Sequence, residues 1–221
     1  MLGTQYSIAL PDYQAVYIDI AKVASSSIKS YLATVIGIAG SSGNPHDIDF
    51  PSPLDPDPTG HRLYPGLYTF AFVRNPWDRL VSCYRDKIAG EVQGYTAFAD
   101  NGIAHCLAGF DAFSADMSFT DFAHAVVSIP DQQADEHFRS QTDYLTSARG
   151  ALAVDFVGRY ENLSADFARV RALLKLPEEI ELPRLQAAAP ANYVDFYTTE
   201  TRELIAERYA RDIALFSYQF A

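Results

Sequence analysis

The chain has 221 residues, which is enough for one domain with a sizeable hydrophobic core. Apolar residues make up 48% of it and charged residues 20%, as expected for a soluble globular protein. The formal net charge is -11. A charge of this sign repels phosphate backbones, so we do not expect nucleic acid to be a partner.

Cysteine usage and hydropathy give three further expectations. The two cysteines, Cys83 and Cys106, lie far apart and form no CxxC pair, so the sequence predicts no metal site. No run of about 18 apolar residues occurs, so we predict no transmembrane helix. The N-terminus lacks the order of basic, apolar and small residues that marks a signal peptide, and we therefore expect a cytoplasmic protein.

The first predicted unit is a strand followed by a helix. Residues 15–20 form a short run rich in β-branched and aromatic residues, which predicts a buried strand. The serines at 25–27 follow, and serine is a favourable N-cap. Apolar residues then recur at helical spacing from Ile28 to Val35. The pattern is strand, tight loop, helix.

Residues 40–66 are rich in glycine, proline, serine and aspartate. We interpret this segment as a loop or lid rather than a domain linker, because too little chain precedes it to fold alone. Loops of this length inside compact domains are often functional. Two of the five histidines, His46 and His61, lie in it.

A second strand–helix unit follows. Residues 68–73 predict another buried strand. Asn75 and Pro76 supply an N-cap and a proline for the first helical position. Apolar and aromatic residues at helical spacing from Trp77 to Tyr84 then predict a helix.

The remaining elements complete an α/β pattern. We predict helices over 119–128 and about 165–174, a third strand over 152–157, and a last amphipathic helix that carries residues 205–216. Strands that alternate with helices favour a central parallel sheet flanked by helices. The expected architecture is therefore a single α/β domain over residues 1–221. Ligands of such sheets bind beyond the carboxyl ends of the strands.

The first chemical constellation is the loop between the first strand and its helix. Backbone N–H groups at a helix N-terminus favour an anion, the hydroxyls of Ser25–Ser27 add donors, and Lys22 adds a positive charge. A P-loop-like phosphate site would have these parts. The alternative is a serine-capped helix with a surface lysine. The loop is not a Walker A motif, since residues 21–29 contain no glycine and the lysine precedes the serines.

The second constellation follows the second strand. Arg74 comes at the end of that strand, and Ser82 lies about two turns into the next helix. A guanidinium and a nearby hydroxyl can hold a dianionic phosphate. The alternative is that Arg74 pairs with a carboxylate such as Asp78 and that Ser82 faces solvent.

The two segments together resemble the paired signatures of the sulfotransferases that use 3'-phosphoadenosine 5'-phosphosulfate (PAPS), in particular the carbohydrate sulfotransferase branch. The match is dense in RNPWDRLVSCYRDK, residues 74–87. In the first segment Ala21 stands where the family usually has proline. VGRYENL at 157–163 and the C-terminal YARDIALFSYQF also resemble family segments.

The resemblance implies a sulfuryl transfer from PAPS to a hydroxyl, with adenosine 3',5'-bisphosphate (PAP) as the product, and an acceptor on a carbohydrate or glycolipid. Lys22 would lie near the leaving oxygen, and Arg74 and Ser82 would hold the 3'-phosphate. The residues implied in cofactor binding are Lys22, Val23, Ala24, Ser25, Ser26, Ser27, Arg74 and Ser82. The family's chemistry implies no metal.

An acceptor hydroxyl needs a general base, and histidine is suited to that function near neutral pH. The resemblance points to His61, in the loop before the second strand, as the base. His137, in a segment that also resembles the family, is the second candidate, and Glu161 or Asp19 is a more distant third.

Two other functions stay open at this stage. A P-loop-like small-molecule kinase would share the architecture, but it needs a glycine-rich loop followed by Lys-Ser or Lys-Thr. A catalytically inactive nucleotide-binding protein would keep Arg74 and Ser82 and lack a competent base.

Overall fold

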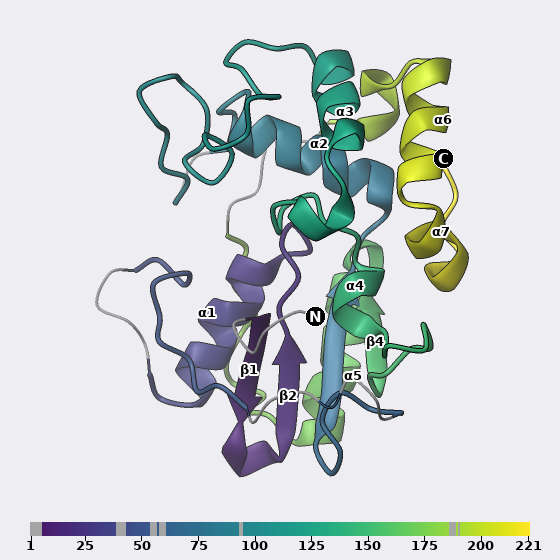
Figure 1. The fold of residues 1–221 in the computed structure, drawn as a ribbon. Coiled ribbons are helices and arrows are strands. Elements are labelled where there is room, and N and C mark those ends of the chain that lie inside the picture. Colours follow the sequence, from purple (N-terminus) through teal and green to yellow (C-terminus); the bar gives the residue numbers. More distant parts are fainter. Residues whose placement is uncertain are drawn as a thin grey trace. The chain divides into compact units, whose positions relative to one another are not determined.

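The computed structural model describes residues 6–38, 43–53, 57, 61–92, 95–185, 189 and 191–221 (Figure 1). The described chain divides into two compact units. Unit 1 runs to Arg74 and resumes over Gln141–Leu185, and unit 2 comprises Asn75–Ser140 with the described residues after 185. The expectation of a single domain over residues 1–221 stays a prediction.

Unit 1 contains the sheet. Its strands are β1 (Ser7–Leu10), β2 (Ala15–Ile18), β3 (Tyr68–Val73) and β4 (Phe156–Arg159), and its helices are α1 (Ser25–Val35), α4 (Thr142–Leu145) and α5 (Leu163–Leu174). The strand order is β1-β2-β3-β4. β2, β3 and β4 pair in parallel, as the sequence predicted, and β1 adds an antiparallel edge strand that was not predicted.

Aromatic packing fixes how α1 and α5 cover the sheet. The ring of Tyr31 in α1 meets Phe167 of α5 edge-on at 4.9 Å between centroids, and Phe167 lies 6.1 Å from Phe72 of β3. Both helices therefore lie on the face that carries Phe72, and α4 lies on the opposite face (Figure 1). On β4, Gly158 admits the Phe72 ring, since a Cβ there would lie 2.4 Å from it.

Unit 2 is helical. It contains α2 (Pro76–Lys87), α3 (Phe119–Ser128), α6 (Thr199–Arg208) and α7 (Ala210–Phe216), with short 3-10 turns η3 (Asp131–Gln133) and η5 (Tyr193–Phe196). α2 packs on α3, α6 and η5, and α3 packs on α6. Their contact is aromatic: the ring of Phe119 lies 4.8 Å from Tyr197 and 5.5 Å from Tyr84. Each buried ring of this kind contributes roughly 1.5–3 kcal/mol.

The helix starts predicted at 76 and 119 are confirmed by their caps, but the serine cap expected for the first helix is not found, since Ala24 is the N-cap of α1. The Asn75 side chain accepts a hydrogen bond from the Trp77 N–H at 3.1 Å, and Ser118 accepts from the Asp121 N–H at 3.1 Å. The last predicted helix is instead two helices, because Tyr209 leaves helical geometry between α6 and α7. Its hydroxyl donates to the carbonyl of Phe138 at 2.6 Å.

Two other expectations need correction or fall partly outside the description. The third strand begins at Phe156 rather than Leu152, because Leu152 forms an isolated bridge with Thr146 and Asp155 lies beside Thr69. Of the predicted loop at 40–66, residues 40–42, 54–56 and 58–60 lie outside the described part, and the rest carries no helix or strand. Within the described residues no helix is long and apolar enough to span a bilayer.

Candidate functional site

The loop between β2 and α1 has an unusual backbone. Lys22 and Ala24 both adopt a φ of 70°, a left-handed conformation that residues other than glycine seldom take. Val23 lies between them with its side chain fully buried, which anchors the loop to the core. No side chain caps α1, whose first turn consists of the buried serines Ser25–Ser27. The predicted strand–loop–helix is confirmed, and its helix terminus retains the electrostatic preference for an anion.

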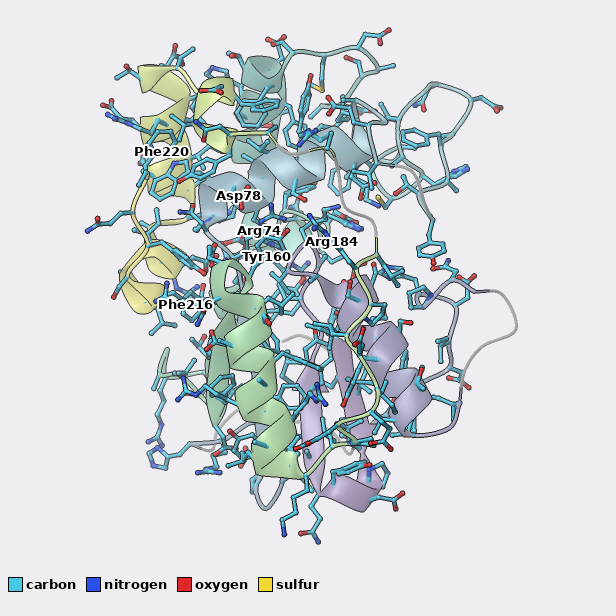
Figure 2. All side chains as sticks on the ribbon, turned by 180° about the vertical axis from the view of Figure 1, so that it is seen from behind. Arg74, Asp78, Tyr160, Arg184, Phe216 and Phe220 are labelled. Atoms are coloured by element: carbon cyan, nitrogen blue, oxygen red, sulfur yellow. The ribbon has the colours of Figure 1, made fainter. Side chains whose placement is uncertain are left out.

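Arg74 contacts this loop. It follows β3 directly, and its Nη1 donates to the carbonyl of Lys22 at 3.2 Å. The guanidinium lies 4.0 Å from the centroid of the Tyr160 ring, a cation–π distance (Figure 2). The structure therefore places the arginine of the second motif beside the lysine of the first, at the carboxyl end of the parallel strands.

Gln141 holds the backbone of Arg74. Its side-chain oxygen accepts from the Arg74 N–H at 2.9 Å, and its side-chain nitrogen donates to the Arg74 carbonyl at 2.9 Å. Gln141 is fully buried. A buried amide with both hydrogen bonds made restricts the backbone from which the arginine side chain projects.

A second group lies at the start of α1. The Nε2 of His46 lies 2.8 Å from Ser26 Oγ, and its Nδ1 lies 3.3 Å from Lys29 Nζ. Lys29 in turn forms an ion pair with Asp19 at 3.0 Å. Because an ammonium only donates, Nδ1 accepts and the neutral ring carries its proton on Nε2. His46 then donates to Ser26, which directs the serine's hydroxyl proton away from the ring.

The chain after α5 also contacts α1, at its middle and at its first turn. The Tyr31 hydroxyl donates to the carbonyl of Pro177 at 3.0 Å, and the Leu185 N–H donates to Ser27 Oγ at 3.1 Å. The exposed Arg184 therefore lies next to a residue bonded to the first turn of α1 (Figure 2). It adds a cation that the sequence patterns did not indicate.

His61 belongs to a segment at the amino ends of the strands, opposite the end where the Lys22 loop lies. Its neighbour Arg62 forms an ion pair with Asp155, directly before β4, and the Leu63 N–H donates to Ala153 at 3.0 Å. These contacts lie at the amino ends of β3 and β4. The six residues of β3 span about 20 Å between the two edges. The structure thus does not bring His61 to the Lys22 loop.

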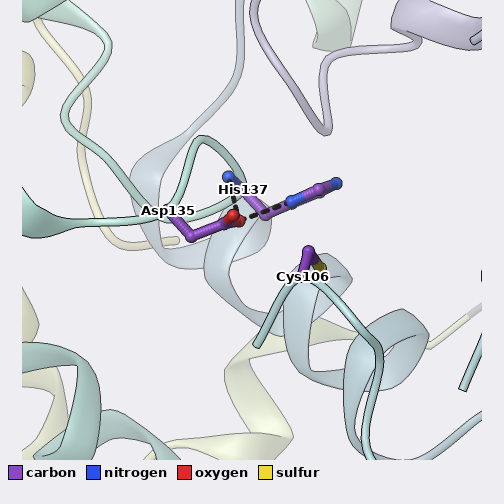
Figure 3. A group of neighbouring side chains, drawn as sticks. All are labelled: Cys106, Asp135 and His137. Carbon is purple, nitrogen blue, oxygen red and sulfur yellow. Dashed lines mark hydrogen bonds and ion pairs between the residues drawn. The ribbon is translucent and has the colours of Figure 1, made fainter. Parts of the chain in front are cut away.

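Unit 2 holds the other predicted site residues. Ser82 is half-buried on α2. His137 Nδ1 lies 2.6 Å from Asp135 Oδ1, a short hydrogen bond that fixes the ring orientation. Cys106 lies beside this pair, and one ligating atom from each of the three residues falls within 4.8 Å of the others (Figure 3). These are the described residues that could hold a metal ion, and their sequence spacing did not reveal it.

The segment that carries His137 is braced by buried groups. Arg79, the second arginine of the RNPWDR motif, donates to the carbonyls of Arg139 at 2.8 Å and Glu136 at 2.9 Å. The Tyr209 hydroxyl donates to the carbonyl between them, that of Phe138. Three neighbouring carbonyls are thereby paired, which limits the motion of His137.

Comparison with known proteins identifies the family. A model of the sulfotransferase family matches residues 5–219, which is nearly the whole chain. The chain belongs to the sulfotransferase family. No solved structure matches it.

Several relatives of this sulfotransferase chain carry names. Carbohydrate sulfotransferase 14 of Homo sapiens is 28% identical in an alignment of 222 positions. The alignment covers 93% of this chain and 58% of the human protein. Carbohydrate sulfotransferase 11 of Danio rerio is 27% identical over 94% of this chain and 65% of its own length. An uncharacterized Archaeoglobus fulgidus protein is 33% identical over 61% of this chain and 88% of its own length. The chain thus spans about three fifths of the named relatives it matches.

Family membership confirms the resemblance on which the sequence prediction rested, and the geometry adds residues that the patterns missed. Gln141, Tyr160, His46 and Asp135 each contact a predicted site residue or the first turn of α1. The contact between Gln141 and Arg74 joins positions 67 apart in sequence, so no local pattern could have shown it. For Asp135 a weak signal existed, since it precedes His137 by two residues in DEHF.

Proposed function

We propose that this chain is a PAPS-dependent sulfotransferase that transfers a sulfuryl group to a hydroxyl of a carbohydrate. The observation that carries the proposal is the contact between Arg74 Nη1 and the Lys22 carbonyl. It places Arg74, from the second of the segments that resemble the family, beside the loop of the first. Family membership supplies the reaction type, and the geometry supplies the residues that would carry it out.

The donor set fits a phosphorylated and sulfated nucleotide. Lys22 and Arg74 provide positive charge, and the first turn of α1 provides backbone N–H groups with no side-chain cap. Ser26 adds a hydroxyl whose proton is directed away from His46. PAPS would supply a sulfuryl group bonded to a phosphate leaving group, and the chain's own donors would neutralise that phosphate.

Each group has a distinct task in this proposal. The N–H groups of residues 24–27 hold the 5'-phosphate, and Lys22 stabilises the negative charge that develops on its leaving oxygen. Arg74 holds the 3'-phosphate, with its backbone fixed by Gln141 and its guanidinium stacked on Tyr160. Ser82 is assigned to the same phosphate by resemblance to the family.

For the general base we propose His137, with His61 as the second candidate. Asp135 holds His137 Nδ1 at 2.6 Å, so the proton resides there and Nε2 presents its lone pair. A base that is oriented by a carboxylate in this way is ready to accept a proton from a hydroxyl. His61 has no comparable support, because its neighbour Arg62 is held at the amino end of β4.

The acceptor class follows from two observations. The named relatives are carbohydrate sulfotransferases. The chain's net charge of -11 favours a neutral carbohydrate over a highly acidic polysaccharide, which a basic surface would attract.

The alternatives are less well supported. A kinase would need a glycine-rich loop, and residues 21–29 contain no glycine. A catalytically inactive binding protein would have no need of an oriented histidine, and the short His137–Asp135 bond argues against it.

Turnover with radiolabelled PAPS and a panel of neutral and acidic oligosaccharides tests the proposal. We expect transfer of label to a neutral acceptor in the presence of EDTA, and none when ATP and magnesium replace PAPS. Phosphoryl transfer from ATP without sulfuryl transfer from PAPS would establish the kinase instead. Tight PAP binding without turnover on any acceptor would favour the inactive binding protein.

A further inference from the structure

A side-chain cluster in unit 2 has the composition of a metal site. Cys106 comes from the loop between α2 and α3, and Asp135 and His137 come from the segment after η3 (Figure 3). We propose that these three residues bind a zinc ion, and that its binding inhibits sulfuryl transfer by occupying His137. The inhibitory part rests on the proposed function, and the metal site itself does not.

The ligand types match zinc. Thiolate sulfur, imidazole nitrogen and carboxylate oxygen are its usual protein ligands, and three of them with a water complete a tetrahedral site. Bond lengths of about 2.0–2.3 Å place tetrahedral ligands roughly 3.2–3.8 Å apart. The three ligating atoms here already lie within 4.8 Å of one another. Side-chain movements of about 1 Å are therefore enough to bring them to the distances of a zinc site. Binding releases the Cys106 thiol proton to solvent, since the thiolate is the ligand. Where His137 binds zinc through Nδ1, the proton that it donates to Asp135 moves to Nε2.

Local charge favours a cation at this point. Three carboxylates, those of Asp135, Asp86 and Glu136, lie near Cys106, and Lys87 is the nearby cation. Asp86 is itself buried and paired with Lys87 at 3.3 Å, which leaves the lysine's charge largely balanced. The remaining negative charge would be offset by a divalent ion.

Both parts of the site are held in place before any metal binds. Arg79 and Tyr209 brace the segment of His137, as described above. On either side of Cys106, the Ala104 N–H donates to the Lys87 carbonyl at 3.0 Å and Leu107 is fully buried. A preformed ligand set loses little conformational entropy when the metal binds.

Cobalt binding to the EDTA-treated protein tests the site without reference to activity. We expect one equivalent of Co²⁺ to give a sulfur-to-cobalt charge-transfer band, which zinc abolishes by displacement. Cys106→Ser should remove the band, and His105→Ala, at the exposed neighbouring position, should keep it. Absence of the band in the wild type, or its retention in Cys106→Ser, would overturn the proposed site.

Sulfuryl transfer tests the inhibition. We expect zinc to inhibit the wild type and His105→Ala reversibly, with EDTA restoring activity, and Cys106→Ser to need more than about tenfold more zinc. The inhibitory part would be overturned if zinc inhibited Cys106→Ser as strongly as the wild type. It would also be overturned if zinc bound to the wild type without inhibiting it. If the EDTA-treated wild type shows no sulfuryl transfer, the proposed function fails while the cobalt spectrum still decides the site.

Discussion

Gln141 holds Arg74 by both of its backbone groups, with two hydrogen bonds of 2.9 Å from one buried amide. The pairing matters because Arg74, the first residue of the second signature, contacts the Lys22 loop. If the guanidinium holds the 3'-phosphate, its affinity for that group depends on how firmly the backbone beneath it is placed.

Substitution of Gln141 tests this dependence. Gln141→Leu removes both hydrogen bonds and should weaken PAP binding by about tenfold, since each bond contributes about 1 kcal/mol. AMP, which lacks the 3'-phosphate, should bind as before. Calorimetry measures both, and circular dichroism verifies folding. The exposed Gln133→Leu is the matched control. Equal loss for PAP and AMP would show that Gln141 serves only the fold.

Lys22 should affect the reaction rate more than binding. Its charge acts where the leaving phosphate becomes negative, so Lys22→Ala should lower kcat by a larger factor than it weakens PAP binding. Lys175→Asn is a suitable control, because asparagine tolerates the left-handed backbone of that exposed residue. A raised KM for PAPS with an unchanged kcat would make Lys22 a binding residue alone.

The general base can be assigned by comparing two histidines. Removing it typically costs about a hundredfold to ten-thousandfold in rate. We expect His137→Ala to lose kcat on that scale with PAP affinity nearly intact, and Asp135→Asn to lose at least about tenfold because it disturbs the tautomer. His61→Ala and the exposed His124→Ala should keep kcat near the wild-type value. A large loss in His61→Ala with none in His137→Ala would reverse the assignment.

The stability of unit 2 should depend on Asp131. Burial raises the pKa of this carboxyl, but hydrogen bonds from Arg208 and Ser140 lower it more, so the net pKa lies below its usual range. The folded state thus gains stability above the unfolded pKa of about 3.9, and that gain disappears as the pH falls through the lowered folded value.

Asp131→Asn tests this directly. It should destabilise the protein by about 1–3 kcal/mol at neutral pH, because charged hydrogen bonds to Arg208 and Ser140 are lost. The difference in unfolding free energy between the variant and the wild type should shrink toward pH 3 or below. It should shrink by about the stability that the wild type loses when its Asp131 carboxylate is protonated. Urea unfolding at both pH values gives the measurement. Asp116→Asn, at an exposed left-handed position, is the control. A pH-independent difference would show that the carboxylate's charge contributes nothing.

Much of the fold could be predicted, because its signals are local. The strand at 68–73 and the helix at 119–128 were predicted with their observed bounds, since their apolar patterns are visible in sequence. β1 was missed because it is four residues long and depends on pairing with β2. The break at Tyr209 was missed because its cause includes a hydrogen bond to Phe138, 71 positions away.

The site shows the same division between local and distant signals. The Lys22 loop and Arg74 could be named because they follow strands in recognisable order. Their partners could not: Gln141 is 67 positions from Arg74, and His46 reaches Ser26 from a loop with no pattern of its own. The position of His61 was inferred from the loop before β3, and the pairing of Arg62 with Asp155 holds that segment at the opposite edge.

The central claim is that the chain recognises PAPS, and calorimetric titration with PAP and AMP tests it most directly. The two nucleotides differ only in the 3'-phosphate, which Arg74 is proposed to bind. A charge-assisted hydrogen bond of this kind contributes roughly 1.5–3 kcal/mol, so PAP should bind about ten- to a hundredfold more tightly than AMP. Arg74→Ala should abolish that preference, and Arg169→Ala, an exposed arginine on α5, should preserve it. Equal binding of PAP and AMP by the wild type would contradict the account.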